Sequence, residues 1–172
     1  MTAVSLTACG RSGDSATRPA ASASAAAPRA TTTTPGAVQC PSEPTQRFAK
    51  ARFATNIGLA VGTFNHWIYQ PYRAGTFAAG AKGREIALVK AGAAGVFAAK
   101  QLTDARTNVL ADPALCRAFL GPLTAAQTQL EELAEQLTQG RVADIPAVET
   151  TLLDVTRTAE RRGIAITERV GI

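Results

Sequence analysis

With 172 residues, the chain is long enough for a single domain with a sizeable core. Hydrophobic residues make up 46% of the sequence but aromatic residues only 5%, so the apolar content is largely alanine and favours a closely packed helical core. The formal net charge of +5 comes from scattered basic residues without interleaved aromatic ones, a pattern that argues against binding to nucleic acid.

The N-terminus resembles the cleavage site of a bacterial lipoprotein, in which a cysteine becomes the lipidated first residue of the mature chain. The residues that carry the resemblance are Leu6-Thr7-Ala8-Cys9-Gly10. We therefore expect residues 1–9 to be the remnant of a signal peptide and Cys9 to be lipidated. Because only five residues precede Leu6, too few for a complete export signal, we also expect the true start to lie upstream. A secreted protein without an anchor and a chance match are the alternatives.

Residues 10–44 predict a disordered Ser/Thr/Ala/Pro-rich linker. The runs at 22–28 and 31–35 consist of small residues, threonine and proline, and no Leu, Ile, Phe, Tyr or Trp occurs between residues 10 and 37. Such a segment cannot bury enough apolar surface to offset the entropy lost on ordering. A flexible spacer after a lipidated cysteine would give a membrane-anchored domain its reach.

The chain contains three cysteines, Cys9, Cys40 and Cys116, and an odd number in an exported protein needs an explanation. Lipidation of Cys9 would leave Cys40 and Cys116 as a disulfide pair, which an oxidising compartment favours. This bond would close a loop of about 76 residues, with a stabilisation of roughly 4–5 kcal/mol in the chain-entropy description. Alternatively, Cys116 is a small buried apolar side chain and Cys40 a free thiol.

Residues 45–163 predict a helical bundle domain. In the first helix, Thr45 is a suitable N-cap, and Pro71 is expected to end the helix near Tyr69 or Gln70. One apolar stripe runs along this helix at spacings of three and four residues: Phe53, Ile57, Val61, Phe64 and Ile68. Gly58 and Gly62 lie on the opposite side, where we expect them to admit a neighbouring backbone.

The second helix is predicted from about Arg84 to Leu110. It is apolar around most of its circumference, which is typical of a central helix, and we expect it to form a tight antiparallel pair with the first. Its polar positions gather on one narrow strip: Lys90, Lys100, Gln101 and Asp104. The small residues Ala91, Gly95 and Ala99 repeat at intervals of four and favour close packing.

The rest of the domain predicts a helical hairpin with two matched apolar seams. Asp112 and Pro113 suit the start of the third helix, and Gly121-Pro122 is expected to break or kink it. Gly140 is a suitable stop signal, and Asp144 a suitable cap for the last helix, which fades at Gly163. The seams are Leu123, Ala126, Leu130, Leu133 and Leu137 in the third helix, and Ile145, Val148, Leu152, Val155 and Ala159 in the fourth.

The predicted fold class is therefore all-α: an up-and-down bundle of four main helices, the third either continuous or split, after a disordered N-terminal tail. Residues 164–172 are expected to be a C-terminal tail, either loose or docked on the bundle.

Aromatic and polar residues cluster near the end of the first predicted helix. The only histidine, the only tryptophan and both tyrosines of the chain fall within seven residues: His66, Trp67, Tyr69 and Tyr72. These side chains could contact a small ligand in a pocket. The alternative is that they close one end of the bundle, with their polar tips at its rim.

The segment from Ala51 to Gly75 resembles the start of an uncharacterised group of secreted or lipid-anchored proteins from high-GC actinobacteria. The resemblance covers the first helix best. It implies a location in the cell envelope and a helical body, and it implies no activity.

The sequence contains no motif of a catalytic, metal or cofactor site. A single histidine cannot form a multi-histidine metal site, and no nucleophile elbow, Walker or dinucleotide fingerprint is present. We therefore expect no catalytic residue, metal or cofactor, and predict a non-enzymatic cell-envelope lipoprotein. Its expected partners are the membrane, through the N-terminal lipid, and another envelope protein, but not nucleic acid. The alternative is an extracytoplasmic small-molecule-binding protein with a pocket near residues 64–73.

Overall fold

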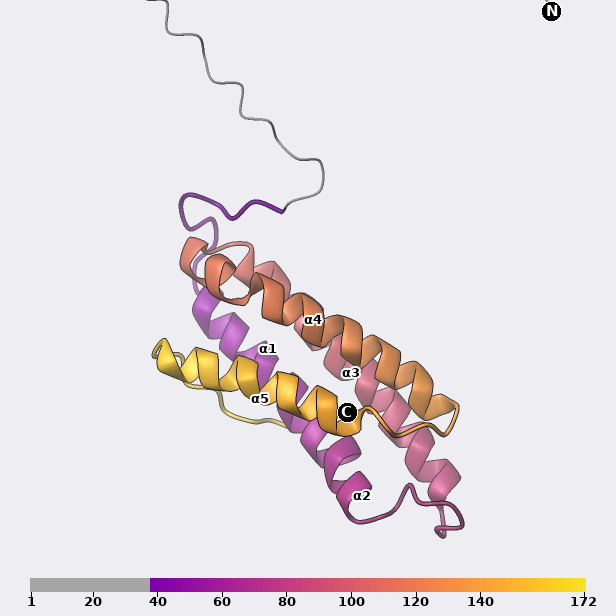
Figure 1. Cartoon of the computed structure of the whole chain (residues 1–172). Coiled ribbons are helices and arrows are strands. Elements are labelled where there is room, and N and C mark those ends of the chain that lie inside the picture. Colours follow the sequence, from indigo (N-terminus) through magenta and orange to yellow (C-terminus); the bar gives the residue numbers. More distant parts are fainter. Residues whose placement is uncertain (1–37) are drawn as a thin grey trace, which may run out of the picture. The chain divides into compact units, whose positions relative to one another are not determined.

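The computed structural model describes residues 38–172, which form an all-α bundle of four main helices (Figure 1). The helices run alternately up and down in chain order. The elements are α1 (Ala49–Phe64), the π-helical turn η1 (Asn65–Tyr69), the short α2 (Gln70–Arg73), α3 (Arg84–Val109), α4 (Pro113–Thr138) and α5 (Ile145–Arg161). Cys9 and most of the predicted linker lie outside the described residues.

The core consists of the apolar stripes that the sequence predicts. All five stripe residues of the first predicted helix, four in α1 and Ile68 in η1, are buried, as are both five-residue seams of α4 and α5. Phe53 and Phe119, both in the early turns of their helices, pack together with ring centroids 4.7 Å apart. Alanines of α3 fill much of the space between these large side chains, so the bundle is built around a small-residue helix: Ala91, Ala94, Ala98, Ala99 and Ala105.

The first helix begins three residues later than an N-cap at Thr45 predicts, because the N-cap position is occupied by Phe48. The Thr45 backbone N–H and hydroxyl both donate to the Ala111 carbonyl, at 2.9 and 3.4 Å. Thr45 therefore ties the entry segment to the end of α3 instead of capping α1. The residue before the helix is Phe48, whose φ of 61° is left-handed and costs about 1–2 kcal/mol for a side chain with a Cβ.

Pro71 does not end the first helix where the sequence predicts. Helical structure continues to Arg73 because η1 widens the turn before the proline. The Gln70 N–H donates to the Asn65 carbonyl five residues earlier, whereas Pro71 has no N–H to donate. In a regular α-helix the proline ring would clash with the carbonyl of Trp67, and a π turn is a known way to relieve such a conflict.

The third main helix is not split. Asp112 caps α4 as predicted, accepting hydrogen bonds from the N–H groups of Ala114 and Leu115 at 2.8 and 2.9 Å. Pro122 lies inside the continuous helix Pro113–Thr138. The buried side chains of Phe119 and Leu123 hold the segments on both sides of the proline in the core, which offsets the lost backbone hydrogen bond.

The turn between α4 and α5 follows the prediction only in part. Gly140 adopts a left-handed φ of 75° just after α4 ends, as its role as a stop signal requires. Asp144 precedes α5 but makes no side-chain hydrogen bond to its N–H groups. Its carboxylate instead accepts a hydrogen bond from Gln136 Nε2 at 2.7 Å, which links the two arms of the hairpin.

The glycines of α1 and of α3 allow close approach by different parts of the chain. Those of α3 admit α4: a Cβ at Gly95 would lie 2.9 Å from the Cβ of Ala134. Those of α1 admit a backbone, as predicted, but that backbone belongs to residues 164–172. A Cβ at Gly62 would lie 2.6 Å from the Arg169 nitrogen, and one at Gly58 would overlap the Thr167 carbonyl.

Residues 164–172, which we call the C-terminal strap, are therefore docked on α1. The Arg169 N–H donates to the Gly58 carbonyl at 2.9 Å, and the Gly171 N–H donates to the hydroxyl of the buried Thr63 at 3.0 Å. Gly171 also contacts the ring of Phe97, so the strap extends from α1 to the flank of α3.

Cys40 and Cys116 form a disulfide, with their Cα atoms 5.6 Å apart. The bond fixes the entry segment to the first turns of α4. Structural disulfides are typical of proteins outside the cytoplasm, which agrees with the expected extracytoplasmic location. None of the helices between residues 38 and 172 combines the length and apolarity needed to cross a membrane.

Gly62→Ala should displace the strap, because the new Cβ would overlap the backbone of Arg169. We expect a loss of about 1–3 kcal/mol in the free energy of unfolding, and faster hydrogen exchange at the Arg169 and Gly171 amides. In a chain truncated after Gly163, the same substitution should instead stabilise α1 by about 0.5–1 kcal/mol through helix propensity. Equal destabilisation in both chains would contradict the assigned role of Gly62.

Candidate functional site

The predicted aromatic cluster is divided between two sides of the π-helical turn. His66 and Trp67 lie against each other, with ring centroids 4.8 Å apart, and Lys90 of α3 lies 6.0 Å from the centroid of the Trp67 ring. The indole Nε1 of Trp67 is buried without a hydrogen-bond partner in the described part of the chain. Tyr72 is half-buried against the core. Of these three side chains, Trp67 therefore packs on the bundle beside Lys90 of α3, whereas His66 is exposed.

Tyr69, the fourth residue of the cluster, faces α5 instead. Its ring stacks on Phe64, with centroids 6.4 Å apart, and its hydroxyl bonds to Glu149 of α5. This hydrogen bond, with a smaller contribution from desolvation, raises the pKa of Tyr69 above its ordinary value of 10.0.

A small cleft lies beside Tyr69, between α1, α5 and the strap. It encloses about 130 Å³ and is lined by Val61, Phe64, Asn65, Tyr69, Glu149, Leu152, Leu153 and Glu168. Asn65 Nδ2 donates to the Glu168 carboxylate at 3.2 Å across its rim. His66, Trp67 and Tyr72 do not line this cleft, so it brings together only one of the four residues that the sequence singles out.

The largest exposed apolar side chains of a regular helix lie on the outer face of α3. Ile86, Val89 and Val96 are 66%, 69% and 64% exposed, and Ala93 between them is also exposed. In sequence these four residues are separated by three, four and three positions, so they form one straight stripe. We call this stripe the α3 face. It is open because α3 packs on α1 and α4, whereas α5 packs on α4 and η1.

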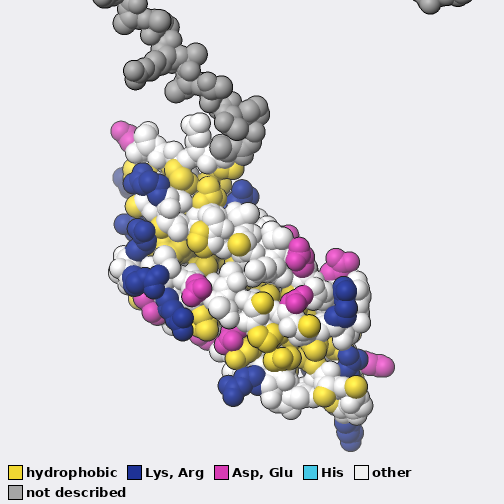
Figure 2. Space-filling model, in the orientation of Figure 1, with side chains coloured by type: hydrophobic (Ala, Val, Ile, Leu, Met, Phe, Trp, Pro, Cys, Tyr) yellow, Lys and Arg dark blue, Asp and Glu magenta, His cyan; other side chains and the backbone are white. Residues whose placement is uncertain are grey.

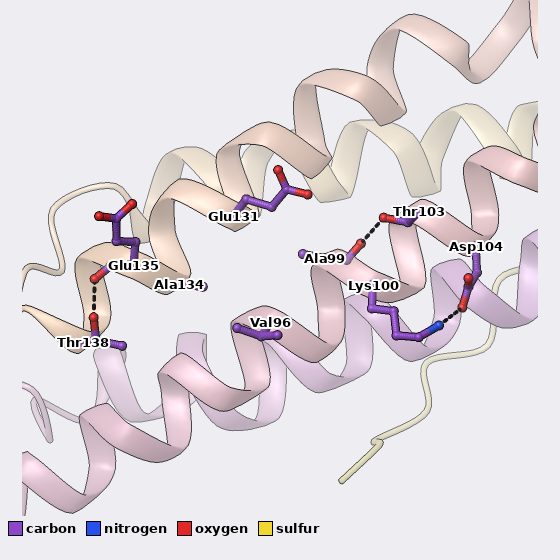
Figure 3. Close-up of a pocket in the computed structure, with 9 residues that line it drawn as sticks. All are labelled: Val96, Ala99, Lys100, Thr103, Asp104, Glu131, Ala134, Glu135 and Thr138. Carbon is purple, nitrogen blue, oxygen red and sulfur yellow. Dashed lines mark hydrogen bonds and ion pairs between the residues drawn. The ribbon is translucent and has the colours of Figure 1, made fainter.

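A groove between α3 and α4 continues the α3 face (Figure 3). It has a volume of about 600 Å³, and Val96, Ala99 and Ala134 are among the residues that line it. Figure 3 shows Glu131 and Glu135 along the α4 side and Lys100 along the α3 side. Lys100 forms an ion pair with Asp104 at 2.8 Å. Since this pair is neutral overall, the two glutamates leave the groove negatively charged.

The face of the bundle drawn in Figure 2 carries both positive and negative side chains. Figure 2 shows Lys and Arg side chains gathered along the left edge of the bundle in this view, near the end of α5, where Arg157, Arg161 and Arg162 occur in the sequence. No cluster of three or more His, Cys, Asp or Glu side chains that could hold a metal occurs within residues 38–172.

Comparisons of the chain with known protein families, with curated proteins and with solved structures found no match.

Sequence reasoning missed the α3 face. It assigned the polar positions of α3 to one narrow strip and placed the rest of the helix in the core, although Ile86, Val89 and Val96 are exposed. The signal that could have revealed the face is the three-and-four spacing of these branched residues, which differ in phase from the buried alanines. Glu149 and Glu168 were also missed, because only the fold brings them near Tyr69.

Glu149→Ala should lower the pKa of Tyr69 toward its ordinary value, because the substitution removes both the hydrogen bond and the negative charge. The pKa can be measured from phenolate absorbance in a Tyr72→Phe background, in which Tyr69 is the only tyrosine. Glu149→Gln is the matched control, since its amide oxygen can still accept the bond, and it should keep part of the shift.

The direction of this pKa shift also fixes the pH dependence of stability. A pKa raised on folding gives a stabilisation that is complete below the ordinary pKa of the phenol and is lost as the pH rises through the folded-state value. The wild type should therefore lose more stability than Glu149→Ala at alkaline pH. Identical alkaline titrations in the two chains would contradict the hydrogen bond.

Proposed function

We propose that this protein is a non-enzymatic interaction module of the cell envelope, held outside the cytoplasm on a flexible tether, and that it binds a protein partner through the α3 face. The observation that carries the proposal is the exposure of Ile86, Val89 and Val96 on a helix whose remaining faces are packed. Contiguous exposed apolar residues with a polar rim are typical of interaction surfaces.

The energetics support a docking role for the α3 face. Full burial of a valine or isoleucine side chain contributes about 1.5–3 kcal/mol, so these three residues could supply a useful part of an interface. They come from a rigid helix, which loses little conformational entropy on binding. The rim supplies specificity, because Glu131 and Glu135 form no ion pair within residues 38–172 and would favour a basic neighbour.

The alternative of a small-molecule-binding protein has less support. The cleft beside Tyr69 encloses about 130 Å³, whereas ligand pockets usually measure about 300–1,000 Å³. The space of about 600 Å³ between α3 and α4 is an open groove that suits a helix better than a small compact ligand.

The tether and its lipid anchor rest on the sequence of residues 1–37 together with the disulfide. The Cys40–Cys116 bond supports export, and the bond accounts for two of the three cysteines, leaving Cys9 as the residue that the lipoprotein resemblance assigns to lipidation.

Cys9→Ser should release the protein from the membrane fraction of cells that export it, because a lipid chain on this cysteine would be the anchor. Mass spectrometry of the mature wild-type protein should show lipid on an N-terminal Cys9. Cys116→Ser is the control, since it removes a different cysteine and should leave the protein in the membrane fraction. Wild-type protein with an unmodified Cys9 would overturn the anchor and leave a secreted protein as the better proposal.

A photoreactive amino acid at Val89 or Val96 should form covalent adducts with a protein partner in intact cells, because both side chains lie on the α3 face. The same amino acid at Thr150, an exposed position of α5, is the matched control and should form few adducts. The adducts are identified by mass spectrometry. Equal yields at all three positions would contradict a partner at the α3 face.

A further inference from the structure

The α3 face has the spacing of a two-stranded coiled-coil seam. Ile86, Val89, Ala93 and Val96 repeat at three, four and three residues, which are the a and d positions of a heptad. The buried alanines of α3 lie on other sides of the helix, so this seam is additional to the bundle's own packing. Such a seam is suited to pair with another helix that has the same spacing, and α3 itself is one.

We propose that the α3 face pairs with the α3 face of a second copy of this chain, the two helices lying parallel about a two-fold axis that follows their length. This pairing rests on the proposed function, since it identifies the partner at the same surface. In a parallel pair, equal positions meet: Ile86 faces Ile86 of the second copy, and Val89 faces Val89. Of the two a positions, Ile86 carries the branched side chain that is typical of two-stranded pairs.

The charges beside the seam favour this parallel arrangement. Glu85 directly precedes Ile86 and occupies a g position, whereas Lys90 directly follows Val89 and occupies an e position. In parallel coiled coils a g residue meets the e residue five positions later on the other helix. Glu85 of each copy therefore meets Lys90 of the other, which gives two symmetry-related ion pairs. Both side chains are exposed and free to form them.

The flanks of the α3 face agree with the same symmetry. On one side of α3 lies α4 with Glu131 and Glu135, and on the other lies α1 with Arg52, which lines a groove shared with Asp104 of α3. A two-fold axis along the helices brings the α4 flank of one copy over the α1 flank of the other, so glutamates approach an arginine. In an antiparallel pair, α4 would face α4 of the second copy, and the glutamates would no longer approach the α1 flank.

The seam is short, because from Ile86 to Val96 it spans only about 16 Å of helix. An isolated peptide of this length would not pair, since helix formation itself opposes it. Here α3 is already folded between α1 and α4, so pairing does not require the helix to form. We therefore expect a reversible dimer.

Disulfide trapping tests the pairing and its direction. The purified full chain carries Cys9→Ser, so that only the Cys40–Cys116 pair remains, together with either Val89→Cys or Val96→Cys. After mild oxidation, both variants should form covalent dimers, because equal positions meet in a parallel pair. In an antiparallel pair only a residue at the centre meets its own copy, so at most one variant would cross-link. Thr150→Cys is the control and should stay monomeric.

Charge exchange tests the ion pairs. By sedimentation equilibrium, Glu85→Lys or Lys90→Glu alone should raise the dimer dissociation constant about tenfold, because two attractive pairs become repulsive. The double exchange Glu85→Lys/Lys90→Glu should return it to within about twofold of the wild type. This rescue separates the ion pair from any structural effect of moving Lys90 away from Trp67.

A wild-type chain that sediments as a monomer at every concentration, or cross-linking at neither cysteine position, would overturn the pairing. Adducts with a different protein at Val89 and Val96 in cells, together with a monomer in solution, would overturn the pairing but keep the proposed function. A monomer in solution that also forms no adduct at Val89 or Val96 in cells would overturn both the pairing and the proposed function.

Discussion

The close packing of α3 between α1 and α4 is the constraint on which the rest of the structure depends. Gly95 brings α3 so near to α4 that a Cβ there would lie 2.9 Å from Ala134, and buried alanines fill the space toward the core. Small residues occupy the two sides of α3 that contact α1 and α4. The branched residues Ile86, Val89 and Val96 therefore lie on the third side, which faces outward. The apolar surface is therefore a consequence of how α3 is packed, because α5 covers α4 and η1 rather than the outer side of α3.

The first helix also holds the C-terminal strap, which is the non-helical segment at residues 164–172, against the helical bundle. An extended backbone has N–H groups that need acceptors, and α1 supplies them at the Gly58 carbonyl and the Thr63 hydroxyl. Close approach requires that Gly58 and Gly62 have no side chain. Held in this way, the strap contacts Phe97 of α3 and lies along one side of the α3 face. Packing on α1 thus determines one border of the candidate interface.

Most of the fold could be predicted from periodicity, because each buried stripe is a local pattern. The ends of the helices could be predicted only where the signal was local as well, as for the Asp112 cap. Thr45 was misassigned because its true partner, Ala111, is 66 residues away, and the π-helical turn before Pro71 depends on packing around both sides of the proline. The disulfide could be predicted from cysteine number, but the α3 face was not recognised because every side of α3 except one narrow polar strip was assigned to the core.

The entry point of the chain connects the disulfide, the tether and the direction of pairing. Cys40 is bonded to Cys116 in the first turns of α4, and Thr45 is bonded to Ala111 at the end of α3, so the chain enters the domain at the C-terminal end of α3. In a parallel pair the two entry points lie at the same end. In an antiparallel pair they would lie at opposite ends of a helix about 39 Å long, since α3 has 26 residues. With the proposed lipid anchor at Cys9, two chains on one membrane would reach a parallel pair on equal terms, so the arrangement that the charges favour is also the one that this proposed anchor favours.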